Sequence, residues 1–174
     1  AMGAYVSEVM FWLYRPLTFM LWGGVFERFP RLKAMVVEGG TMFMVPSWLM
    51  LLDHNYTDIQ FSAKLGDFRS HLSMAPSEYF ARNCGIGASC VPRRDLDMRD
   101  QIGLKQIMWG SDFPHPEGTW PNTAQYYQDT FKGFDVDDGR QILGGNAIEF
   151  YGLDRQYLDG LAAEIGPSSS IFNG

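Results

Sequence analysis

The chain has 174 residues, of which 46% are hydrophobic and 20% charged, and a length of this order fits one domain. This composition lies far from the low hydrophobicity and high charge of disordered chains. Against 20 acidic residues stand 14 Lys and Arg, giving a net charge of −6 with no basic block. A nucleic-acid partner is therefore excluded, because no surface of concentrated positive charge is available to meet a phosphate backbone.

Cysteine usage and hydropathy bear on the compartment. Cys84 and Cys90 are the only cysteines, and their spacing matches neither a metal knuckle nor a disulfide framework. We interpret both as reduced thiols packed in the core of a cytoplasmic protein. The most apolar stretch, 9–26, is interrupted by Arg15 and Pro16, so neither a signal peptide nor a membrane span is predicted.

The first half of the chain alternates helical and extended patterns. Dense apolar residues over 7–29 predict one or two helices, with Pro16 in a first turn. The short apolar run 32–38, stopped by two glycines, predicts a buried strand. A helix within 42–55 follows, beginning near Pro46.

The second half repeats this alternation. Residues 65–72 indicate a weak helix or loop, and 74–77 a turn. Strands are predicted at 83–91 and 105–110, separated by a helix over 95–102. Three further helices are predicted at 125–132, 137–143 and 146–151. Strands that alternate with helices favour an α/β fold, and we expect the three strands to lie parallel, in chain order, with helices on one face.

The segment 108–121 carries the clearest chemical signal. Its strand ends at Asp112 and runs into a proline-rich loop that holds His115, Glu117 and Trp120. Active sites of parallel α/β proteins lie at the carboxyl ends of the strands, so Asp112 stands where catalysis is expected.

This segment resembles the last-strand signature of the amidohydrolase-related superfamily, in the subgroup that includes aminocarboxymuconate-semialdehyde decarboxylase and related aromatic-acid decarboxylases and hydrolases. Further phrases resemble the same subgroup and occur in the same order, at 24–33, 38–40, 77–80, 145–147 and 151–153. The resemblance implies strands six to eight of a (β/α)₈ TIM barrel and the helices that follow them.

Such a barrel takes about 250 residues, and five of its strands have no counterpart here. The resemblance therefore implies that 1–174 is a single α/β domain forming the C-terminal part of a longer protein, without the first strands of the barrel. The Ser-rich end of the chain, 167–174, is predicted to be a flexible tail.

The resemblance also implies a divalent metal, with zinc as the expected ion in the full-length parent. The family's ligands are a His-x-His pair, a further His and an Asp, and only the Asp has a counterpart, Asp112. Its implied roles are metal ligand and proton shuttle for a metal-activated water. A turn or helix-cap Asp is the alternative. The sequence contains no His-x-His, so we expect this chain alone to bind metal weakly or not at all.

Two more residues are candidates for catalysis. Glu38 ends its strand where several relatives carry His, and it is expected to contact substrate or orient a ligand, unless it caps the following helix. His115 is expected to bind substrate or act as an acid, unless it only fixes the loop. We expect Glu117 and Trp120 to shape the loop or the pocket wall.

Two functions from different classes remain open. The first is a metal-dependent hydrolase or non-oxidative decarboxylase, a lyase, acting on a small carboxylated and often aromatic substrate. The second is a catalytically incomplete C-terminal fragment or partner-dependent structural module. Unpaired strand edges and exposed apolar side chains would drive it to self-associate or to bind the missing N-terminal part of its parent. The side chains expected there are Met35, Val37, Ile86 and Met108.

Overall fold

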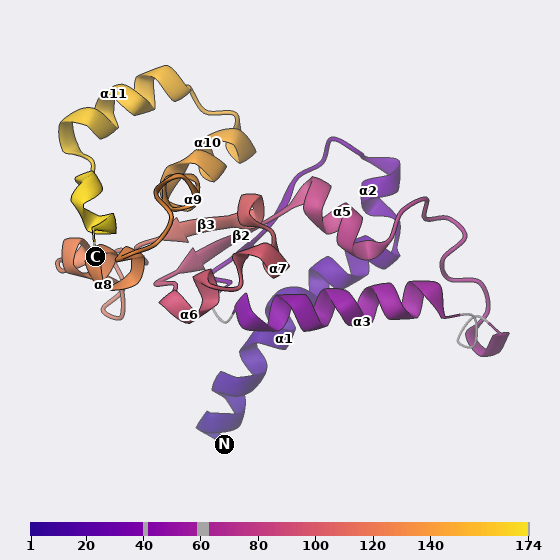
Figure 1. Ribbon diagram of the computed structural model, residues 1–174. Helices are drawn as coiled ribbons and strands as arrows, with labels where there is room; N and C mark the ends of the chain where they lie inside the picture. The colour runs from indigo at the N-terminus through magenta and orange to yellow at the C-terminus, as the bar shows by residue number, and fades with distance from the viewer. Residues whose placement is uncertain (40–41, 59–62, 174) are drawn as a thin grey trace.

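The computed structural model describes residues 1–39, 42–58 and 63–173, and its centre is a three-stranded sheet (Figure 1). The strands are β1 (Ala34–Val37), β2 (Cys84–Ser89) and β3 (Ile107–Gly110). They lie in the order β1-β2-β3, and both pairings are parallel. The predicted parallel arrangement in chain order is confirmed.

Helices lie on either side of the sheet (Figure 1). In this view the helices that precede β2 lie toward one side of the labelled strands β2 and β3, and the helices that follow β3 lie toward the other. Among the described residues the helical segments are α1 (Met2–Trp22), α2 (Val25–Arg28), η1 (Met42–Met44), α3 (Val45–Thr57), α5 (Pro76–Asn83), α6 (Arg93–Leu96), α7 (Arg99–Ile102), η2 (Leu104–Gln106), α8 (Thr123–Phe131), α9 (Val136–Arg140), η3 (a π-helical turn, Gln141–Gly145), α10 (Asn146–Tyr151), α11 (Arg155–Ile165) and η4 (Ser169–Phe172). In this part of the chain no helix has the length and apolar character needed to cross a bilayer.

One face of the sheet forms the centre of the hydrophobic core. Val36, Ile86 and Ile107 lie side by side in the register of the three strands, and each is at most 6% exposed. Their neighbours in the core include Leu17 of α1 and Phe80 of α5. Helix packing therefore buries this face, as expected for a parallel sheet.

The opposite face carries Met35, Gly85 and Met108. A Cβ atom on Gly85 would lie 2.8 Å from Met108 Cε and 3.1 Å from Phe150 Cε2, so only glycine lets these side chains approach β2. Phe150, at the end of α10, thus covers the start of this face. Helical residues consequently contact both faces, which differs from the expectation of helices on one face only.

Two of the four apolar side chains that were expected to be exposed are buried, as the pairing of the strands explains. Ile86 is fully buried because it points to the helix-covered face, and Met108 is only 3% exposed. Met35 is half-buried, and Val37, on the outer strand β1, is 62% exposed. Alternation along a strand assigns residues to two faces, but it does not tell which face the helices cover.

Two helical boundaries differ from the prediction. Pro16 lies inside α1 rather than in a first turn, and the break comes instead at Gly23 and Gly24, where Gly24 has φ 64°. Helix α5 occupies residues predicted to form a turn and the approach to a strand. Pro76 stands in its first turn, and the Glu78 carboxylate accepts a hydrogen bond from the Ala75 N–H at 2.8 Å.

The end of the chain also differs from the predicted flexible tail. Within 167–173, η4 places Ile171 and Phe172 in the core, 6% and 7% exposed. The Phe172 ring packs edge-on against Phe131 with centroids 6.0 Å apart, and a Cβ atom on Gly139 would overlap it. The serines mark a turn whose first residue, Ser168, accepts a hydrogen bond from the Ser170 N–H.

Candidate metal centre

All three strands end at the same edge of the sheet, and each is followed within two positions by a residue in the left-handed backbone region. The φ angles are 56° at Glu38, 50° at Cys90 and 62° at Asp112. Residues other than glycine adopt this conformation at a cost, and such residues concentrate at functional sites. The Cys90 N–H donates to the Gly110 carbonyl at 3.1 Å, which ties the ends of β2 and β3 together. This edge is the candidate site.

Glu38, Asp112 and His115 converge at this edge. One potential metal-ligating atom from each residue lies within 4.8 Å of the other two. His115 Nδ1 is 3.1 Å from Asp112 Oδ1, and the side chains of these residues are 56% and 14% exposed. The structure thus brings together the three residues that the sequence singled out, from two strands that are not neighbours in the sheet.

The loop after β3 has a tightly bonded backbone. The His115 N–H donates to the Asp112 carbonyl at 2.9 Å, and the Thr119 N–H donates to the Ser111 carbonyl at 2.9 Å. A Cβ atom on Gly118 would lie 2.8 Å from the Ser111 carbonyl oxygen and 3.0 Å from that of Asp112. Glycine at 118 therefore allows the loop to close behind the Asp112–His115 pair.

The charges of the site act on His115. Its hydrogen bond to Asp112 and the negative charge of that carboxylate raise the imidazole pKa, and Glu117 and Glu38 act in the same direction. The edge therefore favours positive charge. Two carboxylates and an imidazole are also donors that divalent cations accept.

Trp120 packs on a residue of its own loop, and only one of the two cysteines lies in the core. Trp120 is 67% exposed and stacks edge-on against Phe113, with ring centroids 5.9 Å apart, on the outside of the loop. Cys90 is half-exposed, and its Sγ lies 3.9 Å from the Glu117 carbonyl oxygen. Cys84 is 3% exposed, and burial raises its pKa to about 12. The interpretation as a core thiol holds for Cys84 and is wrong for Cys90, because β2 ends before it.

Sequence reasoning missed Asp95, a carboxylate near the same edge. Asp95 is 1% exposed, and its Oδ2 accepts a hydrogen bond from the Met42 N–H at 2.9 Å, while Arg94 Nε lies 3.4 Å from its Oδ1. It ties the segment after β1 to α6. No periodicity marks this role, because the contact joins residues 53 positions apart.

Residues 13–153 match the amidohydrolase family designated Amidohydro_2. The chain belongs to this family. Over 141 residues it is 29% identical to a 2-amino-3-carboxymuconate-6-semialdehyde decarboxylase from Dictyostelium discoideum, a match that covers 80% of this chain and 36% of that protein.

Solved structures of the family share the α/β fold. A 5-carboxyvanillate decarboxylase from Sphingomonas paucimobilis matches 78% of this chain and 38% of its own, with 29% identity and a TM-score of 0.61. An amidohydrolase from Mycobacterium avium subsp. paratuberculosis K-10 matches 75% and 31%, with 27% identity and a TM-score of 0.59.

A dihydroxybenzoic acid decarboxylase from Polaromonas sp. JS666, solved with bound manganese and the inhibitor 2-nitroresorcinol, matches 78% of this chain and 38% of its own, with 22% identity and a TM-score of 0.58; at this identity the match shows the fold alone. This chain therefore spans between 31% and 38% of the length of these relatives. Its α/β fold with a parallel sheet is similar to part of the TIM-barrel fold of amidohydrolase decarboxylases.

The cluster at the strand ends fits the divalent ion that the family implies. In a tetrahedral zinc site the donor atoms lie about 3.3–3.6 Å from one another, given metal–ligand distances of about 2.0–2.2 Å. The potential donor atoms of Glu38, Asp112 and His115 lie within 4.8 Å of one another, so these side chains are near enough to share one ion. Asp112, whose side chain is only 14% exposed, would be the anchor.

Proposed function

We propose that the protein to which this chain belongs is a metal-dependent, non-oxidative decarboxylase of small carboxylated aromatic compounds. The observation that carries the proposal is the convergence of Glu38, Asp112 and His115 at the carboxyl ends of β1 and β3. Family membership supports the amidohydrolase chemistry, and two relatives that are decarboxylases, each 29% identical to this chain, favour C–C cleavage over hydrolysis.

In this proposal Asp112 is the central metal ligand, Glu38 is the nearest additional donor, and His115 stays free of the metal for proton transfer. A bound divalent ion, zinc or manganese, supplies a Lewis acid that lowers the pKa of water and neutralises a substrate carboxylate or phenolate. The carboxylate of Asp112 accepts a proton at Oδ2 or, through the existing contact, exchanges it with His115 Nδ1.

The protein must also deliver a proton to the carbon that loses carbon dioxide. His115 is the residue best suited to that step, because its neighbours raise its pKa and its side chain remains open to a ligand. The negative charge of Glu38 also favours the protonated form of the His115 imidazole. It therefore orients His115 and limits where a substrate carboxylate can bind.

The chain accounts for only part of such an enzyme. We propose that 1–174 is a single domain portion corresponding to strands six to eight of the barrel, and that the rest of the parent provides the remaining donors and the substrate pocket. A second candidate function is a catalytically incomplete module that acts only with a partner. It is favoured by the two unpaired edges, on β1 and β3, of the described sheet.

The test compares this chain with a longer one that includes the remainder of the barrel, after loading with Zn²⁺ or Mn²⁺. Release of carbon dioxide from 5-carboxyvanillate and from dihydroxybenzoates is measured. We expect activity in the longer chain only and at least a hundredfold loss in Asp112→Asn, whereas Asp159→Asn, an exposed change on α11, leaves the rate unchanged. Full activity of Asp112→Asn contradicts the proposed site, and a longer chain that is inactive on all of these acids while cleaving an amide or ester contradicts decarboxylation.

A further inference from the structure

The buried carboxylate of Asp95 has one oxygen without a hydrogen bond from any described group. Its Oδ2 accepts a hydrogen bond from the Met42 N–H at 2.9 Å, whereas its Oδ1 accepts none and has Arg94 Nε beside it at 3.4 Å. Asp95 is 1% exposed, and burying a carboxylate with an unsatisfied oxygen lowers stability. Such a residue needs an explanation other than stability. Its contact with Met42 supplies one, because Met42 follows the strand that leads to Glu38.

Glu38 and Asp112 meet although a strand lies between them. Neighbouring strands are about 5 Å apart, so β1 and β3, on either side of β2, are separated by about 10 Å. The potential metal-ligating atoms of Glu38 and Asp112 nevertheless lie within 4.8 Å of each other. These side chains therefore extend toward each other across the end of β2, and their meeting depends on where the backbone after β1 is held.

Two hydrogen bonds hold the backbone after β1. The Gly39 N–H donates to the Gly87 carbonyl of β2 at 3.1 Å, and a Cβ atom on Gly39 would lie 2.7 Å from Ile86 Cγ2, so the chain passes close over β2. The Met42 N–H donates to Asp95, which belongs to α6, the helix that follows β2. Both hydrogen bonds thus fix the chain after β1 to β2 or to the helix beyond it.

A second contact joins α6 to η1. The Arg94 guanidinium lies over the Phe43 ring, 5.9 Å from its centroid. Consecutive residues of α6 therefore hold consecutive residues of η1, Arg94 with Phe43 and Asp95 with Met42. Because the Arg94 side chain is 77% exposed, its contact is the weaker one, and the hydrogen bond to the buried Asp95 is the main attachment.

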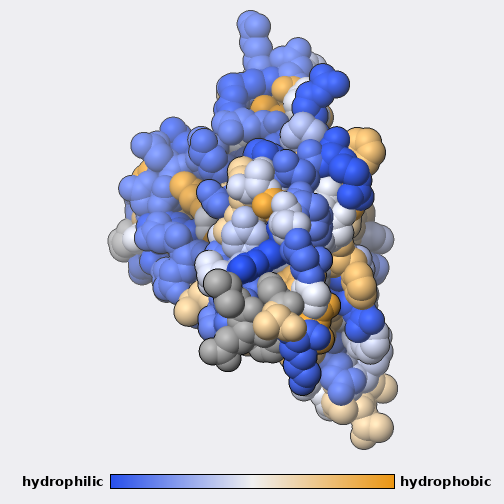
Figure 2. Space-filling view, turned by 90° about the vertical axis from the view of Figure 1, so that its right-hand side faces the viewer, coloured by the Kyte–Doolittle hydropathy of each residue, from blue (hydrophilic) through white to orange (hydrophobic). Residues whose placement is uncertain are grey.

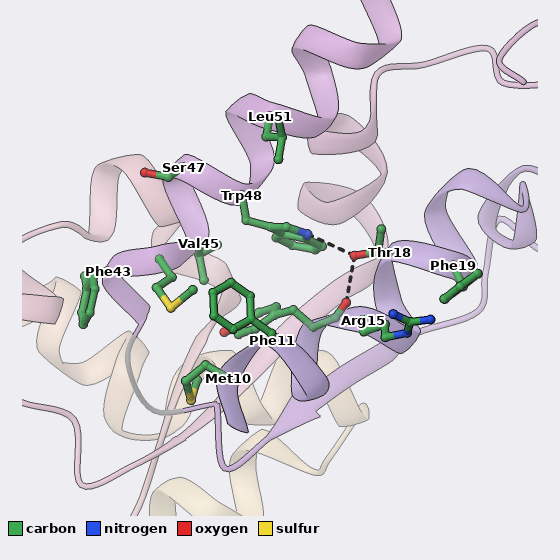
Figure 3. A pocket seen from close by; sticks show the side chains of 12 residues that line it. Met10, Phe11, Arg15, Thr18, Phe19, Phe43, Val45, Ser47, Trp48 and Leu51 are labelled. Carbon is green, nitrogen blue, oxygen red and sulfur yellow. Dashed lines mark hydrogen bonds between the residues drawn. The ribbon is translucent and has the colours of Figure 1, made fainter. Parts of the chain in front are cut away.

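On its other side, the segment formed by η1 and α3 faces α1 across a pocket of about 660 Å³ (Figure 3). Phe43 and Trp48 line this pocket from the segment, and Phe11 lines it from α1. Trp48 Nε1 donates to Thr18 Oγ1 at 3.1 Å, so α1 holds α3 beyond η1 (Figure 3). The first half of α1 projects from the body, which narrows to a tip at the lower end of Figures 1 and 2. In the described chain η1 is therefore positioned from the side of α6.

We propose that Asp95 is a positioning residue of the candidate site. Through the Met42 N–H it holds the chain after β1 so that Glu38 reaches Asp112 across the end of β2. In this proposal Asp95 touches neither metal nor substrate. Its consequence for metal binding rests on the proposed function, whereas the placement of Glu38 is tested without it.

Nuclear magnetic resonance of the 174-residue chain tests the placement. Asp95→Ala removes the acceptor, so the Met42 amide hydrogen should exchange at least about tenfold faster, and the amide signals of Glu38 and Asp112 should shift. Asp95→Asn keeps an acceptor oxygen at the same position and should preserve both the protection and the signals. If Asp95→Ala does not fold, Asp95→Ser takes its place, because the serine oxygen lies one atom closer to the backbone.

Two outcomes of this experiment overturn the proposal. The first is a Met42 amide that stays protected when the acceptor is removed. The second is a Met42 amide that loses protection while the signals of Glu38 and Asp112 remain unchanged. Either would show that the hydrogen bond to Asp95 does not place Glu38.

In the longer chain the readout is the affinity for Zn²⁺ and Mn²⁺. Asp95→Ala and Glu38→Gln should each weaken metal binding about tenfold, and the double variant should lose little more than either, because both changes act through one carboxylate. Asp95→Asn should retain most of the affinity. The control is Phe172→Leu, a change in the core outside the cluster, which should lower the midpoint of urea unfolding and leave metal affinity unchanged.

The metal titrations separate this inference from the proposed function. Weaker binding in Glu38→Gln but not in Asp95→Ala overturns the positioning role and leaves the proposed function standing, and so do losses that add in the double variant. If Glu38→Gln binds metal as tightly as the unchanged chain, Glu38 is not a ligand and the proposed function is wrong in that respect. The amide signals of the 174-residue chain then decide the placement alone.

Discussion

Asn146 is fully enclosed and donates from Nδ2 to the Ile107 carbonyl at 2.7 Å, at the point where β3 begins. The same nitrogen donates to the Leu104 carbonyl at 2.8 Å, and Asn146 is only 2% exposed. One side-chain amide thereby joins the start of α10 to the strand that leads to Asp112. This contact fixes the amino end of β3, and the carboxyl end of the same strand leads to the candidate site.

Replacement of Asn146 by Leu should lower the free energy of unfolding by about 1–3 kcal/mol, because two buried carbonyl groups lose their hydrogen-bond donor. Urea unfolding followed by circular dichroism measures the change. Gln125→Leu, on the exposed face of α8, is the control and should alter stability little. If Asn146→Leu were as stable as the unchanged chain, these hydrogen bonds would not matter to the fold.

Phe172 tests whether the end of the chain belongs to the core. Phe172→Ala should cost about 3–5 kcal/mol, because it empties a buried site against Phe131 and Gly139. A chain shortened to end at residue 166 should be destabilised at least as much. A loss below about 0.5 kcal/mol in the point variant would instead support the flexible tail predicted from the serine-rich sequence.

Acid should destabilise the fold partly through Glu27. Hydrogen bonds from Tyr79 and Ser73 lower the pKa of the Glu27 carboxyl below its ordinary value of 4.5. A carboxyl whose pKa is lowered by folding contributes stability above the unfolded pKa, and this is lost as pH falls through the folded pKa. Glu27→Gln should therefore be less stable than the unchanged chain at pH 7, and the difference should shrink below pH 4.5.

The measurement for Glu27 is the midpoint of urea unfolding at several pH values between neutral and acid. Glu164→Gln, at an exposed position of α11, should follow the unchanged chain throughout. A gap between Glu27→Gln and the unchanged chain that stays constant or widens on acidification would show that the carboxylate charge is not what Tyr79 and Ser73 stabilise.

Metal binding by the isolated chain should be weak. The cluster offers three donors, but His115 is more than half exposed and the donors of the remaining barrel are absent from this sequence. Titration calorimetry with Zn²⁺ and with Mn²⁺ should give a weak signal that Asp112→Asn abolishes and Asp159→Asn preserves. Stoichiometric zinc retained through gel filtration would contradict this expectation, because it would show that Glu38, Asp112 and His115 suffice by themselves.

Gly118 should be required for the shape of the loop. Gly118→Ala places a methyl group against the Ser111 and Asp112 carbonyl oxygens, so the loop must open and the Asp112–His115 contact should lengthen. In the longer chain we expect decarboxylation to fall at least tenfold, with little loss of global stability because the loop is exposed. Gly160→Ala, where an added Cβ meets nothing within 4 Å, is the control.

The sequence by itself determined the local pattern. Short apolar or glycine-rich runs located all three strands, and their alternation with helices predicted a parallel sheet in chain order, because period and chirality are local properties. The segment around Asp112 also identified the family and the end of the sheet where chemistry is expected. Helix α5 was missed because a single turn signal, Pro76, serves equally to begin a helix.

Only the tertiary structure decided which residues meet. Glu38 and His115 are 77 positions apart, and they join Asp112 because β1 and β3 flank β2 and both end at one edge. Burial was likewise decided by packing. Phe172 lies in the core although it closely follows a run of serines, whereas Phe11 and Trp12 remain exposed although their stretch is among the most apolar in the chain. Sequence records the chemistry of each side chain, but which surfaces cover it depends on contacts between distant segments.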